Sequence, residues 1–319
     1  MKITFCITYH NQENFVKDSL ESIFNIDFPI DFEILIYDDC STDNTLVKVK
    51  EYQKKFPDKI KLFANINNNE TDLIKRVSLN RLYMAEYASG DYIMFLDGDD
   101  FYCDKSFLKE AIEIFEKNQK IEAAAFNFEY IFDNKKKEIF EQKLKTGIIS
   151  AKEYISKEYY TPAGAMVFKN TLTKDSIQKL KRIKNFDDNS ITIFFLQAGN
   201  LYYTDKPIYT YRQNANSSWN SKNKTEQILL NALDYKLLSD ISPMLKKEIL
   251  KREFPALKYI YKHRKNLINE LASNYNQYLQ LSANDVFINR LLNWKNIKLK
   301  EKIKIFVQFQ IYKFKAKYL

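Results

Sequence analysis

Glycine, histidine and cysteine are all scarce in this sequence of 319 residues. The five glycines include no pair close enough to form a phosphate-binding loop of the P-loop or dinucleotide type. The two histidines and three cysteines form no cluster with zinc-ligand spacing and leave few partners for a Ser-His-Asp triad. We therefore expect neither ATPase, NAD-dependent nor zinc chemistry, and any catalysis should depend on carboxylates.

Long apolar runs are also missing. The best candidates, residues 123–126 and 191–196, are far shorter than the roughly 18 residues that a membrane-spanning helix needs. An odd number of cysteines without a recognisable signal peptide is typical of a reducing compartment. The sequence therefore predicts a cytoplasmic protein with free thiols.

Positive charge is unevenly distributed along the chain. The net charge is +9, but residues 222–317 alone hold 20 Lys or Arg against 8 Asp or Glu, which leaves the preceding part slightly acidic. Compositional drift and a functional basic surface both explain this excess. The change of sign predicts a boundary near residue 220, with a first domain at 1–219 and a basic, mainly helical region at 220–319.

Short runs rich in β-branched residues alternate with segments of helical spacing. The runs that predict strands lie at residues 2–8, 32–37, 60–64 and 92–96. This alternation favours a mostly parallel sheet covered by helices. Within residues 123–132, aromatic side chains at positions 126, 128, 130 and 132 alternate with others, which predicts a further strand with one drier face and hence a mixed sheet.

Polar clusters follow three of the expected strands. They are Tyr9–Gln12, Asp38–Asp39 and Asp97–Asp100. In open α/β sheets, ligands bind beyond the carboxyl ends of the strands. We therefore expect the functional site to form where these clusters meet.

The third cluster is rich in carboxylates. Asp97, Asp99 and Asp100 would repel one another unless a cation lies among them, and carboxylate oxygens suit a hard divalent ion such as Mg²⁺ or Mn²⁺. Gly98 would help the backbone to bend so that two acids face one ion. The competing interpretation is that Asp100 or Asp104 caps the next helix.

Five motifs occur in an order that is typical of one enzyme family. They are ITYHNQENFVKDSLESI at 7–23, YDDCSTDNT at 37–45, FLDGDD at 95–100, FDDNSITIFFLQAG at 186–199 and YRQNANSS at 211–218. Together they resemble the family 2 glycosyltransferases over roughly residues 1–219. The resemblance implies a GT-A fold, an α/β architecture whose Rossmann-like mixed sheet is flanked by helices, followed here by a C-terminal helical region.

The resemblance also implies a site for a UDP-sugar. Thr8 and Asp39 match positions that bind the uracil, and His10 matches a ring that lies against the base. Asp97 and Asp99 match the DxD pair of the family. Asp99 is the better candidate for the direct ligand of Mn²⁺ or Mg²⁺, which would bridge the protein to the diphosphate.

The last two motifs imply the catalytic base and a closing loop. Asp188 matches the general base of the family, while Arg212 and Ser217 match a loop that closes over the pyrophosphate. Many relatives have a histidine two residues after this arginine, where the present chain has Asn214. An amide is a poor ligand for a borderline metal, so this position differs from the family pattern.

Simpler structural roles compete with these assignments. His10 would be a loop imidazole that pairs with a neighbouring polar side chain. Asp187 and Asp188 would cap the helix that follows them. Arg212 would form a surface ion pair with Asp205.

The activity that the resemblance implies is an inverting transfer of a hexose or N-acetylhexosamine from a UDP-sugar. The acceptor would be a hydroxyl of a glycan or a lipid-linked oligosaccharide, in surface polysaccharide synthesis. A metal-dependent nucleotidyl or phosphoryl transferase is one alternative, and it would release pyrophosphate instead of UDP. A non-catalytic protein that binds a sugar nucleotide without consuming it is the other.

The end of the chain is basic and amphipathic. Residues 290–319 combine nine Lys or Arg with one acid, Glu301, and many apolar residues lie between them. Such a segment predicts peripheral binding to an anionic membrane surface at the inner face of the membrane. Alternatively, Ile303, Phe306, Val307 and Ile311 pack on the catalytic domain or on a second subunit. No nucleic-acid-binding motif accompanies the basic run, so we expect no nucleic acid partner.

Overall fold

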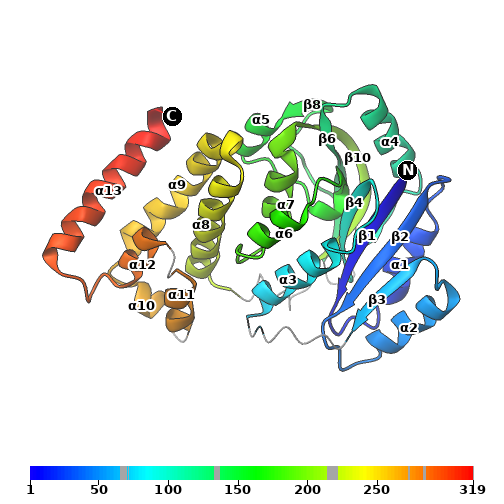
Figure 1. Ribbon diagram of the computed structural model, residues 1–319, viewed down its shortest axis with the longest axis horizontal. Coiled ribbons are helices and arrows are strands. Elements are labelled where there is room, and N and C mark those ends of the chain that lie inside the picture. Colours follow the sequence, from blue (N-terminus) through cyan, green and yellow to red (C-terminus); the bar gives the residue numbers. More distant parts are fainter. Residues whose placement is uncertain are drawn as a thin grey trace.

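A computed structural model describes most of the chain (Figure 1). It covers residues 1–64, 70, 72–132, 137–213, 222–271, 274–282 and 285–318. A large sheet with helices on both faces occupies one end of the molecule, and helices alone occupy the other (Figure 1). The predicted α/β class with a C-terminal helical region is confirmed.

The first part of the chain alternates strands and helices as predicted. Its elements are β1 (Lys2–Tyr9), α1 (Val16–Phe24), β2 (Asp31–Asp38), α2 (Thr45–Lys55), β3 (Ile60–Ala64), α3 (Leu73–Ala85) and β4 (Tyr92–Asp97). Strands β3, β2, β1 and β4 lie next to one another and are all parallel. The carboxyl ends of these strands therefore share one edge of the sheet.

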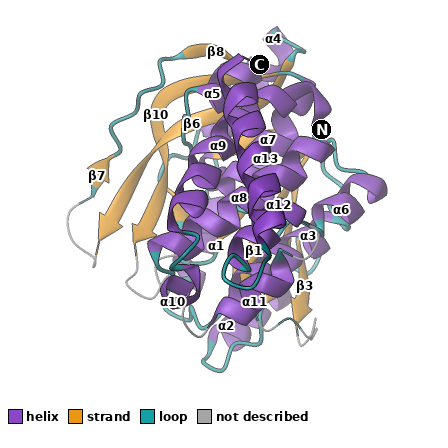
Figure 2. Ribbon diagram, turned by 90° about the vertical axis from the view of Figure 1, so that its left-hand side faces the viewer, coloured by secondary structure: helices purple, strands orange, loops and turns teal. Residues whose placement is uncertain are grey.

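The second part of the chain makes the sheet mixed. Its strands are β5 (Phe101–Tyr102), β6 (Ile121–Phe132), β7 (Glu138–Ile139), β8 (Gly147–Ser150), β9 (Met166–Lys169) and β10 (Asn200–Gln213). The main order is β3-β2-β1-β4-β9-β6-β10-β5, in which β9 is antiparallel to both β4 and β6. The long strands β6 and β10 run parallel and side by side (Figure 2).

Helices cover both faces of this sheet. They are, besides α1 to α3, α4 (Phe107–Lys117), α5 (Ala151–Ser156), α6 (Lys174–Leu180) and α7 (Asp188–Phe195). Successive side chains of a strand point to opposite faces, so Phe5 and Ile7 pack under α1, α2 and α4, while Cys6 packs on the side of α3 and α7. Both layers are buried, which explains the nearly continuous apolar runs of the parallel strands.

The C-terminal region is a bundle of helices. They are α8 (Lys224–Ile241), α9 (Lys246–His263), α10 (Leu267–Leu271), α11 (Tyr275–Leu281), α12 (Val286–Leu292) and α13 (Leu299–Tyr318). Tyr235 and Leu238 of α8 belong to the hydrophobic cluster of the sheet, whereas Leu229 and Leu233 belong to that of the bundle. Helix α8 thus joins the two cores. The expected boundary between residues 219 and 220 lies outside the described residues.

The residues of helix α13 that pack against the protein differ from the four that the packing interpretation named. Ile305 and Phe309 are buried, and the Phe309 ring stacks on Tyr261 of α9 at 4.2 Å between centroids. Ile303 and Phe306 are 56% and 51% exposed, and Val307 and Ile311 are exposed to a similar degree. The interpretation that these four side chains pack on the catalytic domain is therefore wrong.

Candidate active site

The three polar clusters meet at the carboxyl ends of β1, β2 and β4. Tyr9 at the end of β1 is in register with Asp38 of β2, and Thr8 is in register with Asp97 of β4. The carbonyl of Thr8 also accepts a hydrogen bond from the N–H of Gly98 at 3.0 Å. The parallel topology therefore brings together segments that lie some 90 residues apart in the sequence.

The turn after β4 requires glycine at one position. A Cβ atom on Gly98 would lie only 2.2 Å from Cδ1 of the Tyr9 ring and 2.6 Å from Oε1 of Gln12. Any larger residue would force this packed ring to move. Gly98 therefore allows the turn between Asp97 and Asp99 to lie directly against the end of β1.

The three aspartates of this turn have different surroundings. Asp100 is completely buried, and its carboxylate accepts hydrogen bonds from the N–H of Arg212 at 2.7 Å and from the hydroxyl of Tyr209. Burial raises the pKa of Asp100 well above its ordinary value, and the charges of Asp99 and Asp97 raise it further. Asp100 thus anchors β10 to the turn instead of facing the site.

The capping interpretation of this turn is accordingly wrong for Asp100. Asp104 does not cap α4 either, because its Oδ1 accepts from the N–H of Ser106 at 2.8 Å, and Ser106 is the residue before the helix, so this is not one of the helix's first N–H groups. Asp97, by contrast, keeps 41% of its side chain exposed while it pairs with Arg81. This leaves Asp97 and Asp99 as the pair that the turn offers to a ligand.

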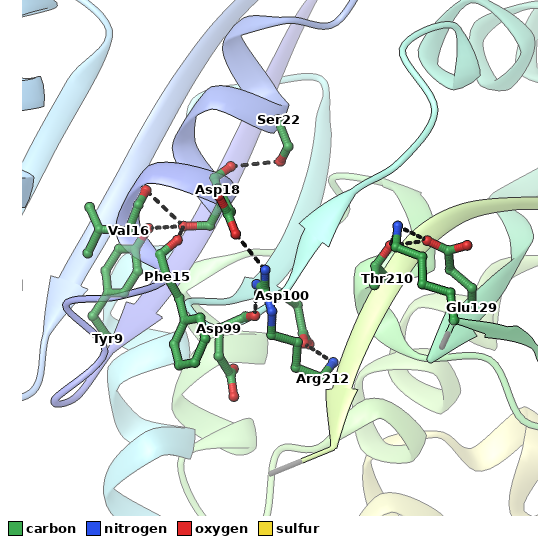
Figure 3. A network of polar contacts seen from close by, with 12 residues as sticks. Tyr9, Phe15, Val16, Asp18, Ser22, Asp99, Asp100, Glu129, Thr210 and Arg212 are labelled. Carbon is green, nitrogen blue, oxygen red and sulfur yellow. Dashed lines mark hydrogen bonds and ion pairs between the residues drawn. The ribbon is translucent and has the colours of Figure 1, made fainter. Parts of the chain in front are cut away.

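Arg212, at the end of β10, connects the turn to α1 (Figure 3). Its guanidinium pairs with the carboxylate of Asp18 and donates to the main-chain carbonyl of Asp99. The rings of Phe15 and Phe101 lie at 4.9 and 4.5 Å from its central carbon. Arg212 is therefore held in one orientation beside the aspartates.

The alternative pairing of Arg212 with Asp205 is wrong. Asp205 instead accepts hydrogen bonds from Asn127 at 2.8 Å and from the Tyr203 hydroxyl at 2.9 Å. Ser217 and Asn214, which follow Arg212 in the same motif, lie outside the described residues. Of the expected closing loop, only the arginine is thus placed.

The residues expected to bind the base lie together at the ends of β1 and β2. Asp39 is buried, and its Oδ2 pairs with Nε of Arg76 on α3 at 2.7 Å. Nδ1 of His10 lies 2.7 Å from the main-chain oxygen of Asp39, and its Nε2 lies 3.4 Å from Nδ2 of Asn11. His10 thus has the neighbouring polar contact of the simpler interpretation, but its shorter contact fixes the ring against Asp39.

The two acids before α7 have distinct roles. Asp187 is the N-cap residue, because its Oδ1 accepts from the N–H of Ser190 at 2.9 Å. Asp188 does not cap the helix. Its Oδ2 accepts from the hydroxyl of Tyr160 at 2.8 Å, and its Oδ1 accepts from the N–H of Ala163 at 3.0 Å. The capping interpretation therefore holds for Asp187 and is wrong for Asp188.

The surroundings of Asp188 bring its pKa close to neutrality. Burial raises the pKa to about 6, and the charges of Asp97 and Asp187 act in the same direction. The guanidinium of Arg81 and the N–H of Ala163 oppose this change because they favour the charged form. A carboxylate that is ionised at pH 7 yet retains this basicity is suited to accept a proton.

Arg81 of α3 is a site residue that the sequence analysis missed. Its Nη2 binds the carboxylate of Asp97, and its Nη1 donates to the carbonyl of Phe186 at 3.0 Å. Phe186 lies two residues before Asp188 in the sequence. One guanidinium, on a side chain that is only 12% exposed, therefore links the aspartate turn to the segment that carries the candidate base.

Arg81 shares one side of α3 with two other polar residues, a pattern too common in amphipathic helices to single it out from the sequence. Lys75, Ser78 and Arg81 recur every three residues, so they lie on one side of the helix. Lys75 donates to the carbonyls of Lys181 and Ile183, and Ser78 Oγ accepts from the N–H of Phe186 at 2.8 Å. The whole face thus holds the chain that leads to Asp188.

The helical region supports the same segment from the other side. Asp234 of α8 is buried and accepts from the N–H groups of Lys184 at 2.6 Å and Asn185 at 2.9 Å. Arg252 of α9 donates to Oδ1 of Asn189 at 2.8 Å. The position of the candidate base therefore depends on both parts of the chain.

The donor set at the turn suits Mg²⁺ or Mn²⁺. Residues 1–318, apart from the short stretches that the structure does not describe, hold no group of three or more His, Cys, Asp or Glu able to enclose a metal. Mg²⁺ is usually bound by one or two carboxylates together with water and substrate phosphates, not by an all-protein cage. Asp97 and Asp99, two carboxylates at a strand end, fit that mode of binding.

Comparison with known proteins gives this site its context. The model of glycosyl transferase family 2 matches residues 4–175, which is more than half of the chain. An uncharacterised glycosyltransferase of Mycoplasma genitalium is 30% identical over 227 residues, which cover 68% of this chain and 72% of that protein. The poly(ribitol-phosphate) beta-N-acetylglucosaminyltransferase TarS of Staphylococcus aureus is 33% identical over 112 residues, which are 35% of this chain but only 18% of TarS.

The fold leads to the same group of proteins. Residues 1–349 of S. aureus TarS, crystallised with UDP-GlcNAc, superpose with a TM-score of 0.60 at 19% identity, covering 91% of this chain and 84% of that one. At this identity the likeness concerns the fold, and it confirms the expected GT-A architecture. The family model spans the ends of β1, β2 and β4 and the aspartate turn, but it ends before Asp188 and Arg212. The chain therefore belongs to glycosyl transferase family 2 and is a glycosyltransferase.

Proposed function

We propose that this enzyme transfers a hexose or N-acetylhexosamine from a UDP-sugar to a hydroxyl of a glycan or lipid-linked acceptor, with inversion at the anomeric carbon. The observation that carries this proposal is the single carboxylate of Asp188. It is oriented by Tyr160 and Ala163, and its pKa is raised by burial to about 6. One positioned base is what direct displacement requires.

The geometry around Asp188 supports the following proton transfer. Asp188 accepts the proton of the acceptor hydroxyl while the hydroxyl oxygen attacks the anomeric carbon and the bond to UDP breaks. The hydrogen bonds from Tyr160 and the N–H of Ala163 prevent the carboxylate from turning away. Since attack and departure occur on opposite sides of the ring, the configuration inverts.

The donor would lie along the carboxyl ends of β1, β2 and β4. Thr8, His10 and Asp39 would contact the uracil, and Arg212 with Ser217 would contact the pyrophosphate. The solved TarS structures that share this fold contain UDP or UDP-GlcNAc, which supports a uridine nucleotide as the donor. TarS is named for the glycosylation of poly(ribitol-phosphate), which supports a surface polymer as the acceptor.

Mn²⁺ or Mg²⁺ would be held by Asp99, with Asp97 beside it. Such an ion supplies positive charge where negative charge builds up on the departing diphosphate. Arg81 would keep Asp97 in place from the other side. The guanidinium of Arg212, fixed by Asp18 and two aromatic rings, adds a second positive charge at the same edge.

A panel of nucleotide sugars tests this proposal. Thermal unfolding of the full chain is followed with UDP-, GDP- and dTDP-sugars, each with and without Mn²⁺. UDP-sugars should raise the Tm, more so with Mn²⁺, and the best of them should release UDP when an acceptor is supplied. Release of pyrophosphate would instead indicate a nucleotidyl transferase, and binding without donor consumption would indicate a non-catalytic protein.

The pH dependence of the reaction should report the ionisation of Asp188. A base is active when deprotonated, so kcat/KM should fall tenfold per pH unit below about pH 6. Tyr160→Phe removes a hydrogen bond that favours the charged form, so this acid limb should move to higher pH. Tyr159→Phe, one residue away, should leave the limb in place. An acid limb that Tyr160→Phe does not move would argue against Asp188 as the titrating group.

A further inference from the structure

One side of α13 exposes an apolar stripe that nothing in the described structure covers. Ile303 and Phe306 are 56% and 51% exposed. With Leu299, Val307 and Ile311, also exposed, they follow the helical period of 3.6 residues and lie on one face. The opposite face, with Ile305 and Phe309, packs on α9. Helix α13 is therefore anchored by one apolar face and presents a second one to solvent.

Lysines border this stripe on both sides. At the same helical period, Lys300 and Lys304 lie along one edge of the stripe and Lys313 lies along the other. Glu301 is the one acid of residues 290–319, and it is engaged by Arg290 at 3.1 Å and by Lys304 at 2.8 Å. Among the described residues, no acidic side chain forms an ion pair with Lys300 or Lys313. The surface around the stripe is thus positive.

The position of α13 leaves the stripe accessible. The helix lies at the end of the molecule away from strands β1 to β3, on the outer side of the helical bundle (Figure 1). Within the described residues, every helix is too short or too polar to cross a bilayer. A helix with an exposed apolar face can contact a lipid surface side-on, lying in the headgroup layer.

We propose that the exposed face of α13 binds an anionic membrane surface. The apolar side chains would enter the boundary between headgroups and acyl chains, while the bordering lysines would reach back to anionic headgroups along their flexible stems. Charge decides between this occupant and a second copy of the chain. A symmetric dimer through this face would bring lysines against lysines, which is unfavourable, whereas anionic lipid complements them.

The binding is tested by sedimentation with vesicles. The full chain is mixed with vesicles of phosphatidylcholine alone, or of phosphatidylcholine with phosphatidylglycerol. It should sediment with the anionic vesicles only, and less so as the salt concentration rises. Replacing Lys300→Gln and Lys313→Gln together should weaken the partitioning by about 25-fold, since each lysine near the surface contributes about fivefold.

A second variant tests the apolar stripe without altering charge. Ile303→Asn, Phe306→Gln and Val307→Asn change only exposed side chains, so the buried contacts of Ile305 and Phe309 with α9 are retained. This variant should lose vesicle binding while its Tm stays close to that of the original chain. Val47→Asn with Met244→Gln, at two exposed apolar positions elsewhere, is the matched control and should bind normally.

The same variants also test the alternatives to a membrane, which are a general polyanion and a second copy of the chain. Equal sedimentation of the stripe variant and the original chain would overturn the proposal. The apolar side chains would then make no contribution, and the binding would be that of a basic surface to any polyanion. A dimer that the stripe variant dissociates in light scattering, without any binding to anionic vesicles, would also overturn it and assign the face to a second copy. Neither outcome depends on transferase activity, so this inference and the proposed function are tested separately.

Discussion

Replacing Asp188 by Asn should leave donor binding nearly unchanged while the rate of transfer falls by roughly 10² to 10⁴, which is the usual contribution of general-base catalysis. An Asn side chain can still accept the hydrogen bond from the N–H of Ala163 through its oxygen. It cannot accept a proton at neutral pH. Calorimetric titration with UDP and a UDP-release assay should therefore separate binding from chemistry.

The neighbouring acid provides the matched control. Asp187→Asn keeps an oxygen that can accept from the N–H of Ser190, and Asn is as good an N-cap residue as Asp. Its rate should stay within a few-fold of the original. If Asp188→Asn lost donor affinity in proportion to rate, Asp188 would be structural. A large fall in rate for Asp187→Asn alone would transfer the role of the base to that residue.

Much of the architecture was predictable because it is local. The strands before Tyr9, Asp38 and Asp97 are apolar runs that end in polar clusters, and their parallel order follows from the helices between them. Once those strands are parallel, the clusters must meet at one edge. The motifs then specified the family, which the match over residues 4–175 confirmed.

Strand β10 escaped prediction because its pairing is long-range and its sequence is irregular. Asp205, Lys206 and Pro207 interrupt its run of aromatic residues, and a proline usually argues against a central strand. In the structure, the pairing of β10 with β6 shifts register on either side of Pro207, so the strand continues past the proline. No local pattern encodes such a bulge.

The role of Arg81 was hidden for a related reason. On α3 it resembles any basic residue of an amphipathic helix, and only the fold brings Asp97 and the carbonyl of Phe186 to its two nitrogens. The buried face of helix α13 could likewise not be predicted from the sequence. Its sequence is apolar on several sides, so it did not reveal that Ile305 and Phe309, not Ile303 and Phe306, face α9.

If Asp99 holds the ion as proposed, replacing it by Asn should reduce UDP release by roughly 10³-fold, because the divalent ion would contribute several kcal/mol of charge stabilisation. The change is nearly isosteric, and the main-chain carbonyl of Asp99 that binds Arg212 remains. The fold should therefore persist. The increase in Tm that Mn²⁺ is expected to cause in the presence of UDP should shrink at the same time, which is a readout independent of turnover.

The control for Asp99 lies just beyond the short strand β5. Asp104→Asn removes a charge five residues away, where the side chain binds the N–H of Ser106 and pairs with Lys206 at 3.0 Å. It should leave both UDP release and the Mn²⁺ response in place. Full activity of the original chain in EDTA would contradict a metal role altogether. A loss of the Mn²⁺ response in Asp97→Asn, with Asp99→Asn unaffected, would instead make Asp97 the direct ligand and require Arg81 to release it.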